Sequence, residues 1–285
     1  DVSGSVVYRY NNYDNSVGPM KQTENNNYKI GLNLSSKVND YVKFNSRFIV
    51  GDRGNGGFTT LNAGKENNFN ANDSRANTQG ADGQADVSLS NAYFGLTAIP
   101  NTVVNIGKQG LTTPYTVAVD INGNEQTGTG ILALSTFGPV TAGAGYFNST
   151  NVNESGNGPI STTRLFNALN TAGANGKGGL DMYVATIQGD LDFVKLEAWY
   201  AGLQNTFNSY TFAATSNIDL AENAKLGLEA RYVDLTFNNK VKNLVGLSSE
   251  DNSMFRLAVD GKFYIVNARL AYTKTDKDGG LTALD

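Results

Sequence analysis

Residues 224–235 read Ala-Lys-Leu-Gly-Leu-Glu-Ala-Arg-Tyr-Val-Asp-Leu, and this stretch decides the fold. One face of it carries Leu226, Leu228, Ala230 and Tyr232, and the other carries Lys225, Gly227, Glu229 and Arg231. Side chains along a β-strand point alternately to opposite faces, so this alternation predicts a strand with one apolar and one polar face.

Similar stretches recur along the chain and predict thirteen strands. The expected strands are 2–10, 28–35, 41–50, 87–98, 102–109, 131–137, 140–147, 181–187, 191–201, 209–217, 224–235, 254–260 and 263–273. Tight turns, among them Gln188-Gly189-Asp190 and Asp260-Gly261-Lys262, are expected at every second junction. The long loops are expected at about 51–85, 110–130, 148–179 and 236–252, and a strict alternation of short and long connections results. Short turns on one side and long loops on the other predict an all-β, transmembrane antiparallel β-barrel.

The composition agrees with a barrel that crosses the membrane with strands. Mean hydropathy is -0.32, and no apolar run approaches the roughly 20 residues that a spanning helix needs. In a spanning barrel only alternate residues face lipid, so each strand keeps a nearly neutral average hydropathy. A soluble β-sandwich would also show alternation, but it has no reason to segregate connection lengths by side. A need for detergent during extraction would exclude the sandwich.

Two missing residue types limit the chemistry. The 285 residues contain no cysteine and no histidine, which removes disulfides, thiolate sites and His-based catalytic triads. We therefore expect no enzyme. A net charge of -4 and a pI near 5.0 argue against a nucleic-acid partner.

Aromatic residues gather toward the ends of the expected strands, where a barrel places its interfacial girdles. They are Tyr8, Tyr10, Tyr28, Phe48, Tyr146, Phe147, Tyr200, Tyr232 and Tyr272. The competing interpretation is that aromatic residues simply favour strands.

The strand count predicts that the barrel continues past the sequence. Thirteen is odd, whereas single-chain bacterial barrels have an even number of strands. An open edge in lipid would leave unpaired amides, each costing several kcal/mol. We expect residues 1–285 to belong to one barrel domain whose C-terminal strands lie beyond residue 285.

Four short motifs suggest a family. They are Asp1-Val2-Ser3-Gly4, Tyr8-Arg9-Tyr10, Ile106-Gly107-Lys108-Gln109 and Thr127-Gly128-Thr129-Gly130. With them the chain resembles the major outer membrane porin of Campylobacter and its epsilonproteobacterial relatives, most strongly over residues 1–150. The resemblance implies an eighteen-stranded homotrimer in the bacterial outer membrane, surrounded by lipid and lipopolysaccharide. It also implies a weakly cation-selective, water-filled channel for ions and small hydrophilic solutes, with the third extracellular loop folded inward.

The inward faces of the expected strands are rich in basic residues. These residues are Arg9, Lys29, Lys43, Arg47, Lys195, Arg231, Arg256 and Arg269, against Glu197, Glu229 and Asp260. If the 110–130 loop folds inward, Asp120 and Glu125 would form a constriction that faces this basic wall across a water-filled gap. Charges arranged in this way tune ion preference. The alternative is that the charges are ordinary solvated lining.

The resemblance further suggests a structural calcium ion near the constriction, although no cofactor is required. Calcium prefers six to eight oxygen ligands, and the candidate ligands are Asp120, Glu125 and Glu154. The alternative is that these loop carboxylates are solvated.

A second function from another class is surface attachment. The Asn- and Gly-rich loops 51–85 and 148–179 would be displayed outside the cell and could bind ligands there. Single-channel conductance separates the two functions, because a barrel with a plugged lumen would conduct poorly.

Overall fold

The computed structural model describes residues 1–14, 22–51, 57–61, 86–119, 123, 125–151 and 181–277. These residues form one antiparallel sheet in which thirteen long strands follow each other in chain order, as predicted. The long strands are β1 (Val2–Asp14), β2 (Gln22–Asn39), β3 (Val42–Gly51), β5 (Asp86–Leu96), β6 (Thr102–Gly110), β7 (Thr127–Phe137), β8 (Val140–Thr150), β9 (Met182–Leu191), β10 (Val194–Leu203), β11 (Phe207–Ala221), β12 (Ala224–Phe237), β13 (Asp251–Phe263) and β14 (Val266–Thr275).

Two short elements accompany the sheet. The two-residue strand β4 (Thr59–Thr60) pairs with β2 beyond the point where the β2–β3 ladder ends. Helix α2 (Asn239–Val245) lies between β12 and β13, and the Asn238 side chain caps its first turn by accepting from the Lys240 N–H. Sequence analysis treated both regions as loop. The part of the chain that the structure describes has no helix with the length and apolarity needed to cross a membrane.

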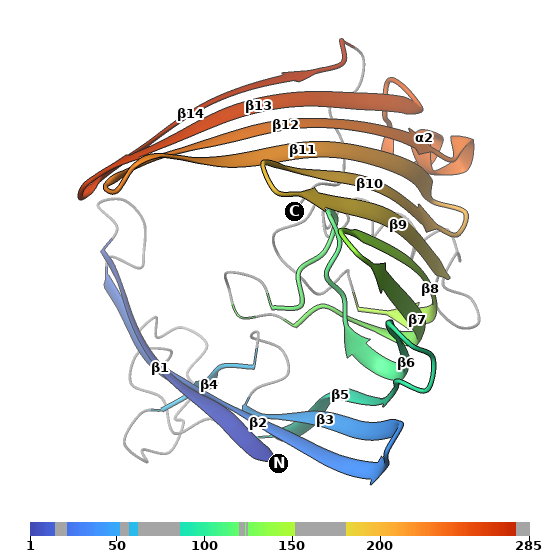
Figure 1. Cartoon of the computed structure of the whole chain (residues 1–285). Helices are drawn as coiled ribbons and strands as arrows, with labels where there is room; N and C mark the ends of the chain where they lie inside the picture. Colours follow the sequence, from blue (N-terminus) through green and yellow to red (C-terminus); the bar gives the residue numbers. More distant parts are fainter. Residues whose placement is uncertain are drawn as a thin grey trace.

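The sheet is strongly curved and forms a wall around a central space (Figure 1). Strands β1 and β14 are its edges and lie on either side of the opening. Among the described residues each of these two strands has a single long neighbour in the sheet.

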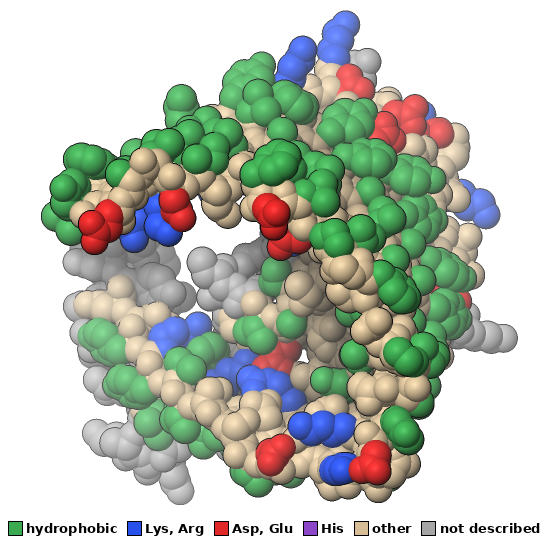
Figure 2. Space-filling view, in the orientation of Figure 1, with side chains coloured by type: hydrophobic (Ala, Val, Ile, Leu, Met, Phe, Trp, Pro, Cys, Tyr) green, Lys and Arg blue, Asp and Glu red, His purple; other side chains and the backbone are tan. Residues whose placement is uncertain are grey.

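The two faces of the wall differ as the alternation predicted. Apolar side chains cover the outside in Figure 2, and charged side chains surround the space within. In β12, for example, Leu228 and Tyr232 are exposed on the outside, whereas Arg231 lines an internal cleft. This arrangement suits hydrocarbon on one side and water on the other.

The predicted turns at 188–190 and 260–262 are wrong. The chain turns instead at Asp192 and at Tyr264, which both have positive φ. The longer ladders place Asp190 opposite Lys195 and Asp260 opposite Arg269, and opposite charges across a strand pair stabilise a sheet. Asp192 is also one of the residue types that accept a left-handed conformation.

Strict alternation of connection lengths is also wrong at one place. The β10–β11 connection belongs to the long-loop side, yet it consists only of residues 204–206. Asn205 adopts a positive φ of 55° there, and the Thr206 N–H donates to the Leu203 carbonyl at 3.0 Å. A tight turn therefore replaces the loop.

An apolar cluster lies on the inner face of the wall, which sequence analysis treated as polar. Its members are Leu111, Tyr115, Phe147, Met182, Val184, Ala201, Leu203, Phe207, Leu235, Phe237 and Val241. Phe147, predicted for the outer girdle, is thus 1% exposed on the inside. Its neighbour Tyr146 is on the outside with its ring 5.3 Å from that of Tyr183, because adjacent residues of a strand face opposite sides.

Candidate functional site

The candidate site is built around the connection between β6 and β7. We call residues 111–126 the inner loop; the structure describes 111–119, 123, 125 and 126 of it. The loop lies inside the curve of the sheet (Figure 1). Its Leu111 and Tyr115 are buried members of the inner apolar cluster.

Tyr115 connects the first half of the inner loop to a distant strand. Its hydroxyl lies 2.6 Å from Oγ1 of Thr211 on β11, and both residues are almost fully buried. Burial raises the pKa of the Tyr115 hydroxyl, while hydrogen bonds with Ser209 and Thr211 act in the opposite direction. The side chain therefore stays a neutral phenol that combines apolar packing with one buried hydrogen bond.

Hydrogen bonds within the inner loop keep it compact. The Leu111 N–H donates to the Gln126 carbonyl at 3.0 Å, and the Gln126 N–H donates to the Ala118 carbonyl at 3.1 Å. The Gln126 side chain accepts from the Val117 N–H at 2.6 Å. These bonds pair the backbone groups of Leu111 and Gln126, two buried residues, with partners inside the loop.

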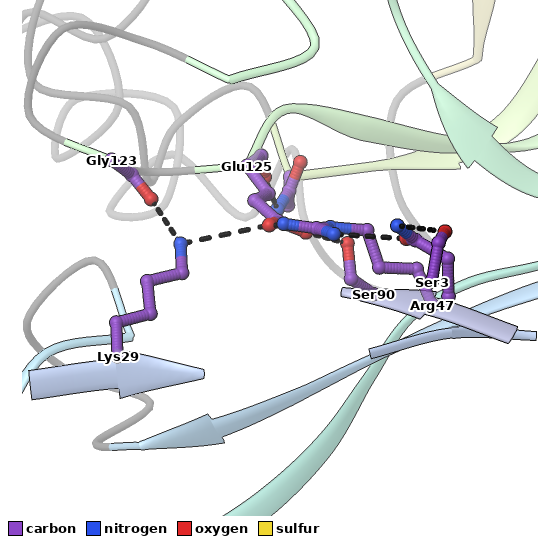
Figure 3. Close-up of polar contacts among 8 residues, drawn as sticks. Ser3, Lys29, Arg47, Ser90, Gly123 and Glu125 are labelled. Carbon is purple, nitrogen blue, oxygen red and sulfur yellow. Dashed lines mark hydrogen bonds and ion pairs between the residues drawn. The ribbon is translucent and has the colours of Figure 1, made fainter. Parts of the chain in front are cut away.

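Glu125 connects the second half of the inner loop to the opposite side of the wall (Figure 3). Its Oε1 accepts from Arg47 Nε at 2.9 Å and lies 3.5 Å from Lys29 Nζ, while its Oε2 accepts from the Ser90 hydroxyl. The Lys29 ammonium also donates to the Gly123 carbonyl at 2.6 Å. The side chains of Glu125 and Lys29 are only 9% and 8% exposed, so little water screens the pair.

Two local features of the strands place these partners. The Arg47 guanidinium donates to Asn33 Oδ1 at 2.9 Å. It also lies over Gly31, where an added Cβ would come within 2.7 Å of Arg47 Nη2. Ser90 is the extra residue of a β-bulge, because Arg47 pairs with Asn91 while Phe48 pairs with Leu89. Bulges redirect side chains, and this one brings Ser90 to the inner loop.

The predicted arrangement of the constriction is therefore wrong for Glu125. The carboxylate does not face the basic wall across a water-filled gap but contacts Lys29 and Arg47 directly. The direct contact is favourable because hydrogen bonds between ionised groups are strong, and little water competes for the Glu125 carboxylate. Asp120, the other predicted constriction residue, lies outside the described residues, as does Glu154.

A second group of predicted basic residues surrounds Glu229 on β12. Glu229 Oε1 lies 3.3 Å from Arg231 Nε and 3.5 Å from Arg256 Nε, and its Oε2 accepts from Arg269 Nη2 at 3.1 Å. Arg269 also lies 3.5 Å from Asp260. On β10, Lys195 pairs with Glu197 at 2.9 Å. These groups are about one-sixth to one-half exposed, so water screens them more than it screens the Glu125 pair.

Among the described residues, Arg9 and Lys43 form no ion pair with either group, although the centre of the Phe58 ring beside Arg9 also lies 6.0 Å from Lys29 Nζ. The Arg9 guanidinium lies 3.8 Å from the centre of the Phe58 ring, a cation–π contact. Lys43 lies 3.6 Å from Asp1, and both side chains are exposed. The predicted basic wall is thus divided, and only Lys29 and Arg47 contact the described part of the inner loop through an ion pair.

The described residues do not fit a calcium site at Glu125. Calcium requires several free oxygen ligands, but both Glu125 oxygens already accept from Arg47, Lys29 or Ser90. Two neighbouring cationic side chains would also repel the ion. No group of three or more acidic, histidine or cysteine ligands occurs in the described parts of the chain.

Sequence reasoning missed Ser90, Gly31 and Glu229 as organising residues. The alternation did place Glu229 on the inward face, which was the available signal for it. Ser90 and Gly31 gave no signal, because a bulge and a close approach to a guanidinium both depend on pairing between strands.

The sequence profile of a family described as Campylobacter major outer membrane protein matches residues 1–284. No curated protein sequence matches the chain.

Solved structures share the fold at low sequence identity. Pseudomonas aeruginosa OpdL is 12% identical, with a TM-score of 0.59 over 96% of this chain and 63% of its own. The outer membrane protein OpdK of the same organism is 14% identical, with a TM-score of 0.63 over 96% of this chain and 66% of its own. Acinetobacter baumannii OccAB4 is 13% identical, with a TM-score of 0.64 over 96% of this chain and 67% of its own. The chain thus spans 63% of the length of OpdL and a similar share of the others.

Proposed function

The chain belongs to the Campylobacter major outer membrane protein family, and from this membership we propose that it forms an outer-membrane channel. The channel would let ions and small hydrophilic solutes diffuse passively across the membrane. The observation that supports this function most is the inner loop, which lies within the curved wall and contacts β3 and β11 from inside.

The chemistry of the two faces gives the mechanism. Apolar side chains on the outside can meet hydrocarbon, while the charged inner face can replace part of the hydration of a passing ion. The inner loop narrows the passage, and its contacts keep it at a fixed place during diffusion. No step of this mechanism needs a catalytic group.

Planar-bilayer recording tests the proposal. Protein extracted from outer membranes with detergent is expected to insert and to give stepwise, ohmic conductance. Protein that is folded by its migration on unheated gels, yet gives no conductance steps, would contradict it.

Weak cation selectivity is the finer part of the proposal. Among the described inward charges, the eight basic residues of the predicted wall outnumber the four acidic residues Glu125, Glu197, Glu229 and Asp260. We therefore assign the cation preference to acidic residues such as Asp120, which lies outside the described residues. Replacement Asp120→Lys should shift the reversal potential in a salt gradient toward anions, and an unchanged reversal potential would count against this assignment.

A homotrimer surrounded by lipid and lipopolysaccharide is also proposed, on the resemblance to the family. Mass measurement in detergent tests the trimer, and a monomeric mass would contradict it. Attachment through the loops 51–85 and 148–179 stays a prediction from sequence, because most of their residues lie outside the described ones. Calcium binding by Asp120 and Glu154 also stays a prediction from sequence, because both residues lie outside the described ones.

A further inference from the structure

A cleft of 690 Å³ lies between the inner loop and the wall formed by the strands from β7 to β14. Thr112, Pro114 and Val117 of the inner loop line one side of it. Arg231, Arg256 and Arg269 line the other side. The cleft lies away from the Glu125 contacts, on the part of the wall nearer the C-terminus.

The basic side of the cleft has more donors than its own carboxylates use. Among the described residues, Arg231 and Arg256 each meet Glu229 through Nε only. A guanidinium carries five N–H donors arranged in a planar fork. Glu229 and Asp260 together cannot neutralise three arginines, so this side presents net positive charge and unused N–H donors to the cleft.

The cleft is also lined by apolar side chains. They come from the inner loop (Pro114 and Val117), from β7 (Leu132 and Leu134) and from β10 (Trp199). Such a surface gains free energy when an apolar group displaces water from it. The arginines would repel a hydrated metal ion, and an inorganic anion would leave the apolar side chains uncovered.

We propose that the cleft is a transient binding site for small amphipathic carboxylates, such as aliphatic or aromatic monocarboxylic acids. The inference rests on the proposed channel function and names a solute class for it. The carboxylate would meet the guanidinium groups of Arg231 and Arg256, since planar forks match carboxylates in a bidentate manner. The apolar body would lie along Leu132, Leu134 and Val117.

Weak binding is consistent with passage through a channel. The Arg256 and Arg269 side chains are 34% and 46% exposed, so water and salt screen their attraction for an anion. A site in a channel must attract its solute and then release it. Partial exposure of the arginines allows both.

Current recording with two matched solutes tests the proposal. Benzoate and benzamide have nearly the same shape, and only benzoate carries a carboxylate. In the wild-type protein from outer membranes, benzoate is expected to block the current with an apparent affinity about three- to tenfold higher than that of benzamide. Inorganic phosphate should block less than benzoate, because it has no apolar body.

Variants locate the effect in the cleft. Arg256→Gln should remove most of the difference between benzoate and benzamide. Lys43→Gln is the matched control, because Lys43 is a basic residue that pairs with Asp1 instead of lining the cleft, and it should leave the difference unchanged. If Arg256→Gln does not fold, Arg256→Lys keeps the charge without the fork and should weaken benzoate block.

Three results would overturn the inference. They are equal block by benzoate and benzamide in the wild type, block by phosphate as strong as that by benzoate, and equal effects of the Arg256 and Lys43 variants. In each case the channel would still conduct. A wild-type protein that does not conduct would instead contradict the proposed function itself.

Discussion

Glu125 is the residue on which the position of the inner loop depends most. Its side chain meets Arg47, Lys29 and Ser90, and its carbonyl accepts from Asn151 Nδ2 at 2.7 Å. Two cations share this carboxylate, so its removal would leave them close together with little water. A buried ion pair is costly to break from one side.

Replacement Glu125→Gln should therefore destabilise the folded protein and alter its selectivity. The expected loss is about 3–5 kcal/mol, the usual cost of leaving a buried charge unpaired. One negative charge fewer should also shift the reversal potential toward anions. Heat-modified migration on gels measures the first effect, and planar bilayers measure the second.

The control for this variant is Asp219→Asn. Asp219 also pairs with a lysine, Lys225, at 2.9 Å, but both side chains are mostly exposed. Asp219→Asn should change neither the stability nor the reversal potential. Similar behaviour of the two variants would show that the burial of Glu125 is not what matters.

Gly31 leaves room for the Arg47 side chain that contacts Glu125. An Ala side chain at this position would meet the Arg47 guanidinium, which is the movable end of a long side chain. Gly31→Ala should thus leave the sheet folded but displace Arg47, and we expect noisier open-channel current from a loosened inner loop. Gly261→Ala is the control, because nothing lies within 4 Å of its added Cβ; quiet current in both variants would contradict this role.

The site could be predicted only in part at this scale. Alternation correctly placed Arg47 and Lys29 inward, and the loop at 110–130 was expected to fold inward with Asp120 and Glu125. Their direct contact with Glu125 could not be predicted, because it depends on the path of the loop. Ser90 was missed because the bulge reverses the alternation within β5.

Among the structural elements, the inner loop is held in two different ways. Its first half is fixed by apolar packing and the Tyr115–Thr211 hydrogen bond, and its second half by ion pairs. Both anchors are mostly buried, so salt in the surrounding water should weaken neither of them strongly.

Tyr115→Phe isolates the polar part of the first anchor. The ring would stay packed, but the buried Thr211 hydroxyl would lose its partner. We expect a loss of about 1–3 kcal/mol, the cost of an unsatisfied buried group, seen as a lower temperature of heat modification. Tyr210 lies on the exposed outer face of β11, so Tyr210→Phe should cost little stability. An equal loss of stability in both variants would contradict the role of Tyr115 as an anchor of the inner loop.

Elements were predicted well where a pattern repeats and poorly where it does not. The strands follow from period-two alternation, but the turns at Asp192 and Tyr264 lie beyond the Gly-containing sites that were chosen. Helix α2 has only seven residues, which is too short for a helical period to be recognised.

For the molecule as a whole, the apolar outer face is what commits the chain to a membrane. Leu257 lies near the middle of β13 and is 43% exposed. Thr215 of β11 lies directly opposite Lys195 and Glu229, so it shares their inner face. Leu257 therefore faces lipid and Thr215 faces the water-filled interior, at a similar depth in the membrane.

An arginine should have opposite consequences at these two positions. Leu257→Arg should destabilise the protein by about 2–4 kcal/mol, the cost of a cation near the middle of the bilayer. Thr215→Arg should leave stability nearly unchanged and lower cation conductance. Heat-modified migration and bilayer recording measure both effects, and equal destabilisation would contradict the assignment of the faces.

The fold class was predictable because thirteen strands repeat the same period-two alternation. A local error, such as the short β10–β11 turn, does not change that result. The inner apolar cluster was not predictable in the same way. Leu235, for example, carries an apolar side chain on the face expected to be wet, and it is buried in the cluster that also contains Leu111 and Tyr115 of the inner loop and Val241 of α2.

The contacts at Arg47 and Thr211 join β3 to β11 across six intervening strands. A chord of fixed length fixes the curvature of the arc that it spans. This part of the wall therefore carries its own radius, set from within by the described residues of the inner loop, in which Gln126 bonds to Val117 and Ala118. Its bend is thus fixed independently of β1 and β14, the two edge strands.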